Sequence, residues 1–270
     1  MLRKRRNLFF QHRVFVFVFV FILSLLISEE SFCFPFSPPP VPDGEIREYG
    51  VRREEKSAVG LKSLIRKGEE VKRISVLSRW RSGDGRRELE IQRTEQRERG
   101  HFCVWTFIFA VIGKTLKSKS YIMEIRSPQG KLLRKESAIL REGEANDAVH
   151  FVAVSEVLRG VNFRVGYEAY IKMWNPEGGD SLPMKVTVVG VEDIAVPLGK
   201  YRAWKVTMAL DSAQILGKWR ALGVVLNTLM PTFTYWLAES VSHPLVRFEG
   251  QFGPKTSAPI EIHELEKITP

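Results

Sequence analysis

Residues 74–91 read ISVLSRWRSGDGRRELEI, and this stretch decides the fold class. Apolar and polar side chains alternate from Ile74 to Trp80, and alternate residues of a β-strand point to the same face of a sheet. Residues 82–85 have the composition of a tight turn, and the alternation resumes at Leu89 among charged neighbours. The stretch is therefore predicted to be a β-hairpin with one apolar face.

Other parts of the chain repeat this two-residue pattern. Residues 102–112 are apolar except for Thr106, which is typical of a strand that is buried on both faces. Residues 127–130 have Pro at the second and Gly at the fourth position of a turn between two strands. We expect strands at residues 102–112, 121–126, 131–140, 161–173, 184–191, 204–210, 232–237, 245–249 and 260–265. The chain is thus predicted to be mainly antiparallel β.

Two stretches have helical spacing instead. Residues 147–159 place apolar side chains on one helical face, Asn146 or Asp147 can cap the start, and Gly160 supplies the stop. Residues 215–230 are apolar apart from two charged side chains. Two interpretations of this second stretch stay open. It is either a core helix or an apolar lid, or membrane-facing flap, that covers a cavity.

The N-terminus has the pattern of a secretory signal. Basic residues precede residues 14–27, which are apolar except for Ser24. As a helix this run would be about 21 Å long, short of the ~30 Å hydrocarbon core of a bilayer. The length and the small residues before the cleavage point predict a signal peptide over residues 1–33, cleaved after Cys33. The mature protein is then periplasmic or otherwise exported.

The rest of the chain divides into a Pro-rich linker over residues 34–46 and a single β-rich domain over residues 47–270. Two other fates of the leader stay open. A lipid on Cys33 would anchor the protein as a lipoprotein, and an uncleaved leader would anchor it as a membrane segment.

Composition narrows the function classes. The chain has 270 residues, is 44% hydrophobic and 27% charged, and carries a formal net charge of +10. Residues 47–99 hold much of the basic excess, but the charges are mixed in sign, and the segment is predicted to be a solvated sheet face. The predicted export argues against nucleic acid as a partner, whereas an anionic membrane surface remains a candidate. Cys103 is expected to be a buried, inert thiol.

The sequence has no signature of a common catalytic centre. It contains no phosphate-binding Gly loop, no Gly-x-Ser-x-Gly and no His-Glu-x-x-His, and its five histidines show no metal-ligand spacing. Asp147 with His150, and His243 with Glu239, are weak acid–base pairs for which capping and surface roles are favoured. The protein is predicted not to be an enzyme and to need no cofactor or metal.

The second half of the chain resembles a bacterial envelope family. The motifs are residues 147–159 (DAVHFVAVSEVLR), 184–190 (MKVTVVG), 196–206 (VPLGKYRAWKV), Tyr235-Trp236-Leu237 and 243–250 (HPLVRFEG). They are similar to domain of unknown function 3108 over about residues 117–265. The resemblance implies a curved antiparallel sheet or half-barrel with one or two helices packed against it, as in the periplasmic lipoprotein carriers.

Two functions are compatible with this prediction. In the first, the concave face of the half-barrel binds or carries a lipid or other apolar molecule. The expected lining is Trp105, Phe107, Trp174, Trp204, Leu216, Trp219, Leu222 and Trp236. In the second, the core is filled and the protein is an envelope scaffold or assembly factor that acts through contacts with another envelope protein.

Overall fold

The computed structural model describes residues 36–54, 71–83, 85–97, 99–139, 148–174, 181–211, 232–251 and 259–270. In this part of the chain thirteen strands form one sheet. The strands of the first half are β1 (Ile46–Glu54), β2 (Val71–Gly83), β3 (Arg86–Arg97), β4 (Phe102–Ile112), β5 (Thr115–Arg126) and β6 (Leu132–Ile139). Those of the second half are β7 (Ala148–His150), β8 (Glu168–Trp174), β9 (Ser181–Val196), β10 (Gly199–Leu210), β11 (Thr232–Ala238), β12 (Leu245–Gln251) and β13 (Ile260–Thr269).

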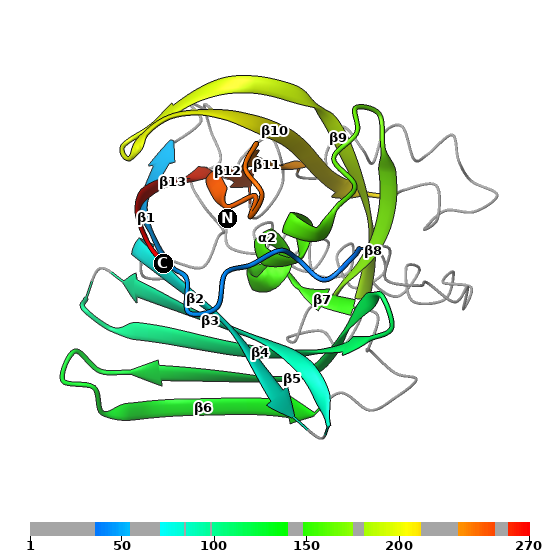
Figure 1. Ribbon diagram of the computed structural model, residues 1–270. Helices are drawn as coiled ribbons and strands as arrows, with labels where there is room; N and C mark the ends of the chain where they lie inside the picture. Colours follow the sequence, from blue (N-terminus) through cyan, green and yellow to red (C-terminus); the bar gives the residue numbers. More distant parts are fainter. Residues whose placement is uncertain are drawn as a thin grey trace, which may run out of the picture.

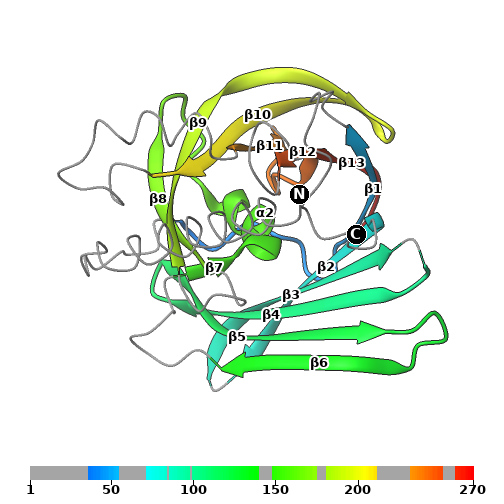
Figure 2. The same ribbon diagram turned by 180° about the vertical axis from the view of Figure 1, so that it is seen from behind.

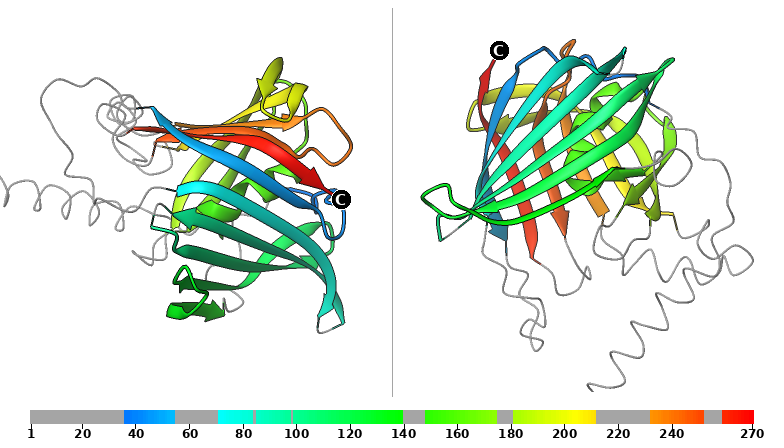
Figure 3. Two further views of the ribbon diagram at one scale, coloured as in Figure 1. Left: turned by 90° about the vertical axis from the view of Figure 1, so that its left-hand side faces the viewer. Right: turned by 90° about the horizontal axis from the view of Figure 1, so that it is seen from below.

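The sheet curves around a short helical segment (Figures 1 and 2). Its strand order is β6-β5-β4-β3-β2-β1-β13-β12-β11-β10-β9-β8-β7, so β6 and β7 form the edges and β1 pairs with β13 in the middle. Neighbouring strands are antiparallel except β7 and β8. Viewed from below, the strands of the first half cross in front of those of the second half (Figure 3). The predicted fold class, a curved mainly antiparallel sheet with a helix against it, is confirmed.

The predicted hairpins are present. In the first, the pairing of β2 with β3 continues to Gly83 and Arg86. In the second, the Gly130 N–H donates to the carbonyl of Ser127 at 2.9 Å and closes the turn between β5 and β6. Gly130 has a φ of +81°, a left-handed conformation that favours glycine. Local turn chemistry therefore decides these connections.

The burial of β4 differs from the prediction. Its bounds coincide with the predicted residues 102–112, but only one face is fully buried, with Cys103 and Phe107 at most 3% exposed. On the other face, Val104, Thr106 and Ile108 are half-buried. The expectation of two buried faces is wrong because the sheet is a single layer here, and its outer face remains partly exposed.

The strand predicted at residues 161–173 begins later, at Glu168 in β8. The residues before it form a turn, in which the Tyr167 N–H donates to Arg164 O at 2.9 Å. Gly166, with a φ of +78°, donates to Val188 O on β9. This left-handed glycine ends the extended conformation that the apolar pattern predicted.

The helix predicted from residue 147 begins directly after β7, at Phe151. A 3-10 turn (η1, Phe151–Ala153), a helical turn (α2, Val154–Val157) and a second 3-10 turn (η2, Leu158–Gly160) follow one another. The cap is His150, whose Nδ1 accepts the Val152 N–H at 3.2 Å. The predicted caps, Asn146 and Asp147, and the predicted helix or lid at 215–230 lie outside the described residues.

The helical segment, residues 151–160, fills the concave side of the sheet. Of its residues, Ala153, Val154, Val157 and Leu158 have no exposed surface. Such all-round burial requires neighbours on every side, and the curved sheet supplies them. The interior next to this segment is therefore packed with side chains.

Residues 36–45, within the predicted linker, pack against one end of the sheet. Phe36 and Val41 are 1% and 5% exposed. The indole Nε1 of Trp80 donates to Val41 O at 2.9 Å, and a Cβ at Gly160 would lie 2.0 Å from Ser37 O. This stretch covers the end of the sheet at which η2 lies.

Candidate functional site

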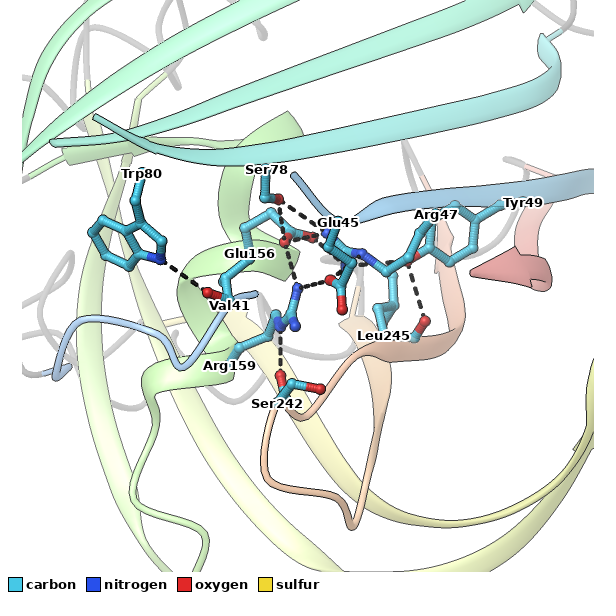
Figure 4. A network of polar contacts seen from close by, with 10 residues as sticks. All are labelled: Val41, Glu45, Arg47, Tyr49, Ser78, Trp80, Glu156, Arg159, Ser242 and Leu245. Atoms are coloured by element: carbon cyan, nitrogen blue, oxygen red, sulfur yellow. Dashed lines mark hydrogen bonds and ion pairs between the residues drawn. The ribbon is translucent and has the colours of Figure 1, made fainter. Parts of the chain in front are cut away.

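Four charged side chains meet between β1 and the helical segment (Figure 4). We call Glu45, Arg47, Glu156 and Arg159 the interior ion network. Arg47 Nη1 donates to Glu156 Oε1 at 2.8 Å, and its Nη2 contacts the other carboxylate oxygen. Arg159 Nη1 donates to Glu45 Oε1 at 2.7 Å and to Glu156 Oε2 at 3.1 Å. The two arginines and two glutamates balance in charge.

The interior ion network is almost completely removed from water. The side chains of Arg47 and Arg159 are 0% exposed, and those of Glu45 and Glu156 are 4% and 1% exposed. Burial alone would raise the pKa of Glu156, but the Arg47 and Arg159 guanidinium groups outweigh it and lower that pKa to about 2. Glu156 is thus held charged between the two arginines, which indicates a structural role of the network in fixing the helical segment to the sheet.

Polar neighbours extend the network. Arg47 also donates to Ser78 Oγ at 3.2 Å, and the Tyr49 hydroxyl donates to Leu245 O at 3.1 Å. Arg159 Nε donates to Ser242 O at 2.7 Å. Burial raises the pKa of Tyr49 to about 12, so its hydroxyl keeps its proton. The network therefore also fixes the turn between β11 and β12.

An aromatic cluster lies around His150 on the concave side. Its members are Trp105, Phe107, Tyr121, His150, Phe151 and Trp174. The His150 ring centroid is 4.9 Å from that of Trp105, 5.1 Å from that of Phe107 and 5.9 Å from that of Trp174. The structure thus brings together three of the predicted lining residues, Trp105, Phe107 and Trp174. Phe151, at 39% exposed, lies at the rim of the cluster.

His150 is a neutral member of this cluster. Burial, with a smaller contribution from the Arg93 charge, lowers its pKa to about 3. Because Nδ1 accepts the Val152 N–H, the proton is on Nε2. Neither His150 Nε2 nor Trp105 Nε1 has a hydrogen-bond partner among the described residues, although both atoms are buried.

The other predicted lining residues lie apart. Trp204 is half-buried near the turn between β11 and β12, 5.6 Å from the ring of Phe163. Trp236 pairs with Lys205 and Arg247 across the sheet and lies on the face opposite to that of Tyr235, its neighbour in the chain. Leu216, Trp219 and Leu222 lie outside the described residues.

A cavity of about 30 Å³ lies on the concave side, toward the end of the sheet at which β10 ends and β11 begins. A cavity of this size has room for a few water molecules at most. The lining is Arg93, Phe151, Ser155, Met173, Met208, Phe233, Tyr235, Leu245, Phe248 and His263. The wall is therefore mostly apolar, with a few polar groups, as is typical of small-molecule sites.

The polar wall of this cavity is part of a larger charged group. Arg93 Nη2 lies 2.9 Å from Glu95 Oε1, and Arg97 Nη2 lies 3.8 Å from Glu95 Oε2. His263 Nε2 lies 2.7 Å from Glu261 Oε1, and Arg53 contacts the same carboxylate. Burial lowers the pKa of His263, which favours its neutral form.

The predicted solvated face over residues 47–99 is therefore wrong at several positions. Arg47, Glu88 and Glu95 are buried, and Arg93 points inward to line the cavity. The alternation on β3 gave a usable signal, because Arg93 is two residues from the fully buried Ile91 and so shares its face. Nothing local indicates the partner of Arg47, which is Glu156, 109 residues away.

The described residues contain no group of three or more His, Cys, Asp or Glu side chains placed to hold a metal ion. None of their helices combines the length and the apolar composition needed to cross a bilayer.

No protein-family model matches the chain, and no curated protein matches it. Membership of domain of unknown function 3108 therefore stays a prediction. Among solved structures, the chain is similar to a beta-barrel-like protein of domain of unknown function DUF1849 from Brucella abortus, with 12% identity, a TM-score of 0.45, and coverage of 84% of this chain and 98% of that one.

Two further structures overlap with the chain more loosely. A candidate lipoprotein of Parabacteroides distasonis shares 12% identity with a TM-score of 0.36, over 89% of this chain and 100% of that one. The Mycobacterium tuberculosis lipoprotein LppX shares 16% identity with a TM-score of 0.25, over 83% of this chain and 87% of that one. The proposals below rest on this chain's own residues.

Proposed function

We propose that the chain is an exported, non-catalytic protein that binds a lipid or other apolar molecule on the concave face of its half-barrel. The observation that supports this is the cavity lined by Met173, Met208, Phe233, Leu245 and Phe248. Apolar side chains that border an opening gain contact area when an apolar ligand enters.

The cavity must enlarge to take such a ligand, since about 30 Å³ is far below the volume of a lipid chain. Three lining side chains can move. Met173 and Met208 are unbranched and flexible, and Phe151 is already 39% exposed. The aromatic cluster lies directly beyond Phe151 and offers more apolar surface to a longer ligand.

Binding of a neutral fluorescent apolar probe tests this function. The carrier proposal expects N-phenyl-1-naphthylamine to gain fluorescence with the purified chain after lipid extraction. Met208→Phe should weaken this binding because the larger ring fills the cavity. Val189→Phe, at a 47% exposed position on β9, is the matched control and should not change it. A probe signal that is absent, or equal in the two variants, would contradict the proposal.

A filled-core scaffold is the second candidate, and the packed helical segment on the concave side favours it. In this case the exposed strand β6, with Leu132 and Leu133 46% and 53% exposed, is a surface for an envelope partner. Native mass spectrometry of protein purified from a bacterial envelope separates the two functions. Co-purified lipid supports carriage, whereas a partner protein bound to lipid-free chain supports the scaffold.

Export and family membership belong to the same proposal. Cleavage after Cys33 predicts that protein from the envelope fraction begins at Phe34, which N-terminal sequencing measures. A lipid-modified Cys33 or an intact leader would replace this prediction with membrane anchoring. A protein of domain of unknown function 3108 that superimposes strand by strand on β5–β13 would support the family resemblance.

A further inference from the structure

An arginine faces the apolar cavity on the concave side. On β3 the inward positions are Leu89, Ile91, Arg93 and Glu95, and the first two are at most 1% exposed. A guanidinium at the third position meets Met208, Phe233 and Phe248 across the cavity. Apolar residues would fill this position at lower desolvation cost, so the charge calls for a functional explanation.

The Arg93 guanidinium has hydrogen-bond donors that Glu95 does not use. Its Nε donates to Glu95 Oε1 at 3.0 Å, and its Nη2 lies 2.9 Å from the same oxygen. Among the described residues this carboxylate is the acceptor found for Arg93, so both N–H groups of Nη1 remain available. A guanidinium with two free donors is well suited to a carboxylate or phosphate oxygen.

The charged groups around Arg93 leave a positive excess. Arg53, Arg93 and Arg97 face this end of the concave side together with Glu95 and Glu261. His263, the remaining titratable neighbour on β13, is held neutral by burial. Three guanidinium groups against two carboxylates give a net charge of +1 at this wall.

The opposite wall is apolar. Phe233 and Phe248 stack with their ring centroids 6.3 Å apart, and Met208 and Leu245 complete the surface. The Tyr235 hydroxyl stays protonated because burial raises its pKa, so it can donate but adds no negative charge. A ligand with an anionic head and an alkyl chain matches the two walls.

We propose that this site takes an anionic amphiphile, with its carboxylate or phosphate head on Arg93 and its alkyl chain against Phe233, Phe248 and Met208. The inference rests on the proposed function and adds the ligand class. Free anions share the head-group chemistry, and neutral lipids share the chain, so the test must contain both.

The experiment compares the affinities of three probes for the full chain after lipid extraction, namely dodecanoate, dodecanol and inorganic phosphate. Each affinity is measured below the micelle concentration, by displacement of N-phenyl-1-naphthylamine or by calorimetry. Because a charge-assisted hydrogen bond is lost with the head group, we expect dodecanoate to bind roughly 10- to 100-fold more tightly than dodecanol. Phosphate alone is expected not to bind.

Variants of one residue then locate the head group. Arg93→Gln should remove the preference for dodecanoate and leave dodecanol affinity unchanged, and Glu95 would keep Arg97 as a partner. Arg93→Lys keeps the charge but loses the planar guanidinium, so it should give an intermediate preference for dodecanoate. This variant keeps the test valid if Arg93→Gln misfolds. Arg52→Gln, with a side chain 50% exposed on the same part of the sheet, is the control and should behave as wild type.

Each outcome has a distinct meaning. Equal binding of dodecanoate and dodecanol, or an unchanged preference in Arg93→Gln, would overturn this inference but leave the binding function in place. Binding of phosphate as tight as that of dodecanoate would make the site an anion site and also overturn it. If no probe bound, the proposed function itself would fail.

Discussion

Replacing Glu156 by glutamine tests the interior ion network directly. Glutamine has nearly the same shape but carries no charge, so Arg47 and Arg159, both 0% exposed, would be left with Glu45 as their only counter-charge in the network. Breaking a buried ion pair in this way costs about 3–5 kcal/mol of unfolding free energy. The variant is expected to lose that amount of stability at neutral pH, because the buried arginines are left under-compensated.

The pKa of Glu156 gives an independent magnitude. Folding lowers it from 4.5 to about 2. Each pKa unit corresponds to about 1.4 kcal/mol, so the charged form contributes roughly 3 kcal/mol. Because the folded pKa is below the unfolded one, this stability is present above pH 4.5 and is lost as the pH falls toward 2. The variant should lack this acid-dependent component.

Urea unfolding followed by tryptophan fluorescence, at neutral pH and along an acid series, measures both effects. Glu54→Gln is the matched control, because that carboxylate is 53% exposed and its ion pair with Arg52 contributes less than about 1 kcal/mol. If Glu156→Gln lost no more stability than Glu54→Gln, the network would not fix the helical segment, and the reasoning would be refuted.

Three further predictions concern stability and reactivity. Gly160→Ala should lower the melting temperature by several degrees, because the new Cβ would lie 2.0 Å from Ser37 O. Gly190→Ala is the control and should leave the melting temperature unchanged, because its Cβ would have nothing within 4 Å. Equal melting temperatures of the two variants would argue against the packing of residues 36–45. His150→Asn keeps an acceptor for the helix cap but removes a group whose pKa falls from 6.5 to about 3 on folding. The wild type should therefore lose unfolding free energy more steeply than the variant as the pH falls through this range. Urea unfolding curves that shift in parallel for the two proteins would contradict this prediction. The pKa of Cys103 rises to about 11 through burial, so a maleimide should label it only after denaturation, and rapid labelling of folded protein would show an accessible thiol.

Local patterns predicted most of the strands and their turns. Alternation of apolar side chains and Pro–Gly turn chemistry depend on neighbours within a few residues, so β2, β3 and β6 could be predicted closely from them. The end of β5 was also predicted, but the strand begins at Thr115, six residues before the expected start at Tyr121. The start of β8 could not, because Gly166 interrupts an apolar run with a conformation that the run itself does not reveal. Nor could β7, which exists only through its parallel pairing with β8.

The candidate site was less accessible to prediction, because it depends on contacts between distant parts of the chain. Trp105, Phe107 and Trp174 were expected on one surface, and they meet because His150 lies between their strands. Trp236 was expected with them, but it lies on the other face of the sheet. Arg93 was assigned to a solvated surface because its side chain is charged, although the alternation with Leu89 and Ile91 places it on their buried face.

The pairing of β1 with β13 makes the strand order a circularly permuted meander. Read from one edge, the order runs from β7 to β13 and then from β1 to β6, so every spatial neighbour would be consecutive in a chain that was joined at Ile46 and Thr269 and opened between β6 and β7. In the natural chain, the pairing of β1 with β13 joins the residues of the sheet that are most distant in sequence. Its formation therefore requires the closure of a long loop, which slows folding. A rearranged gene of this kind would give the same architecture by a faster route.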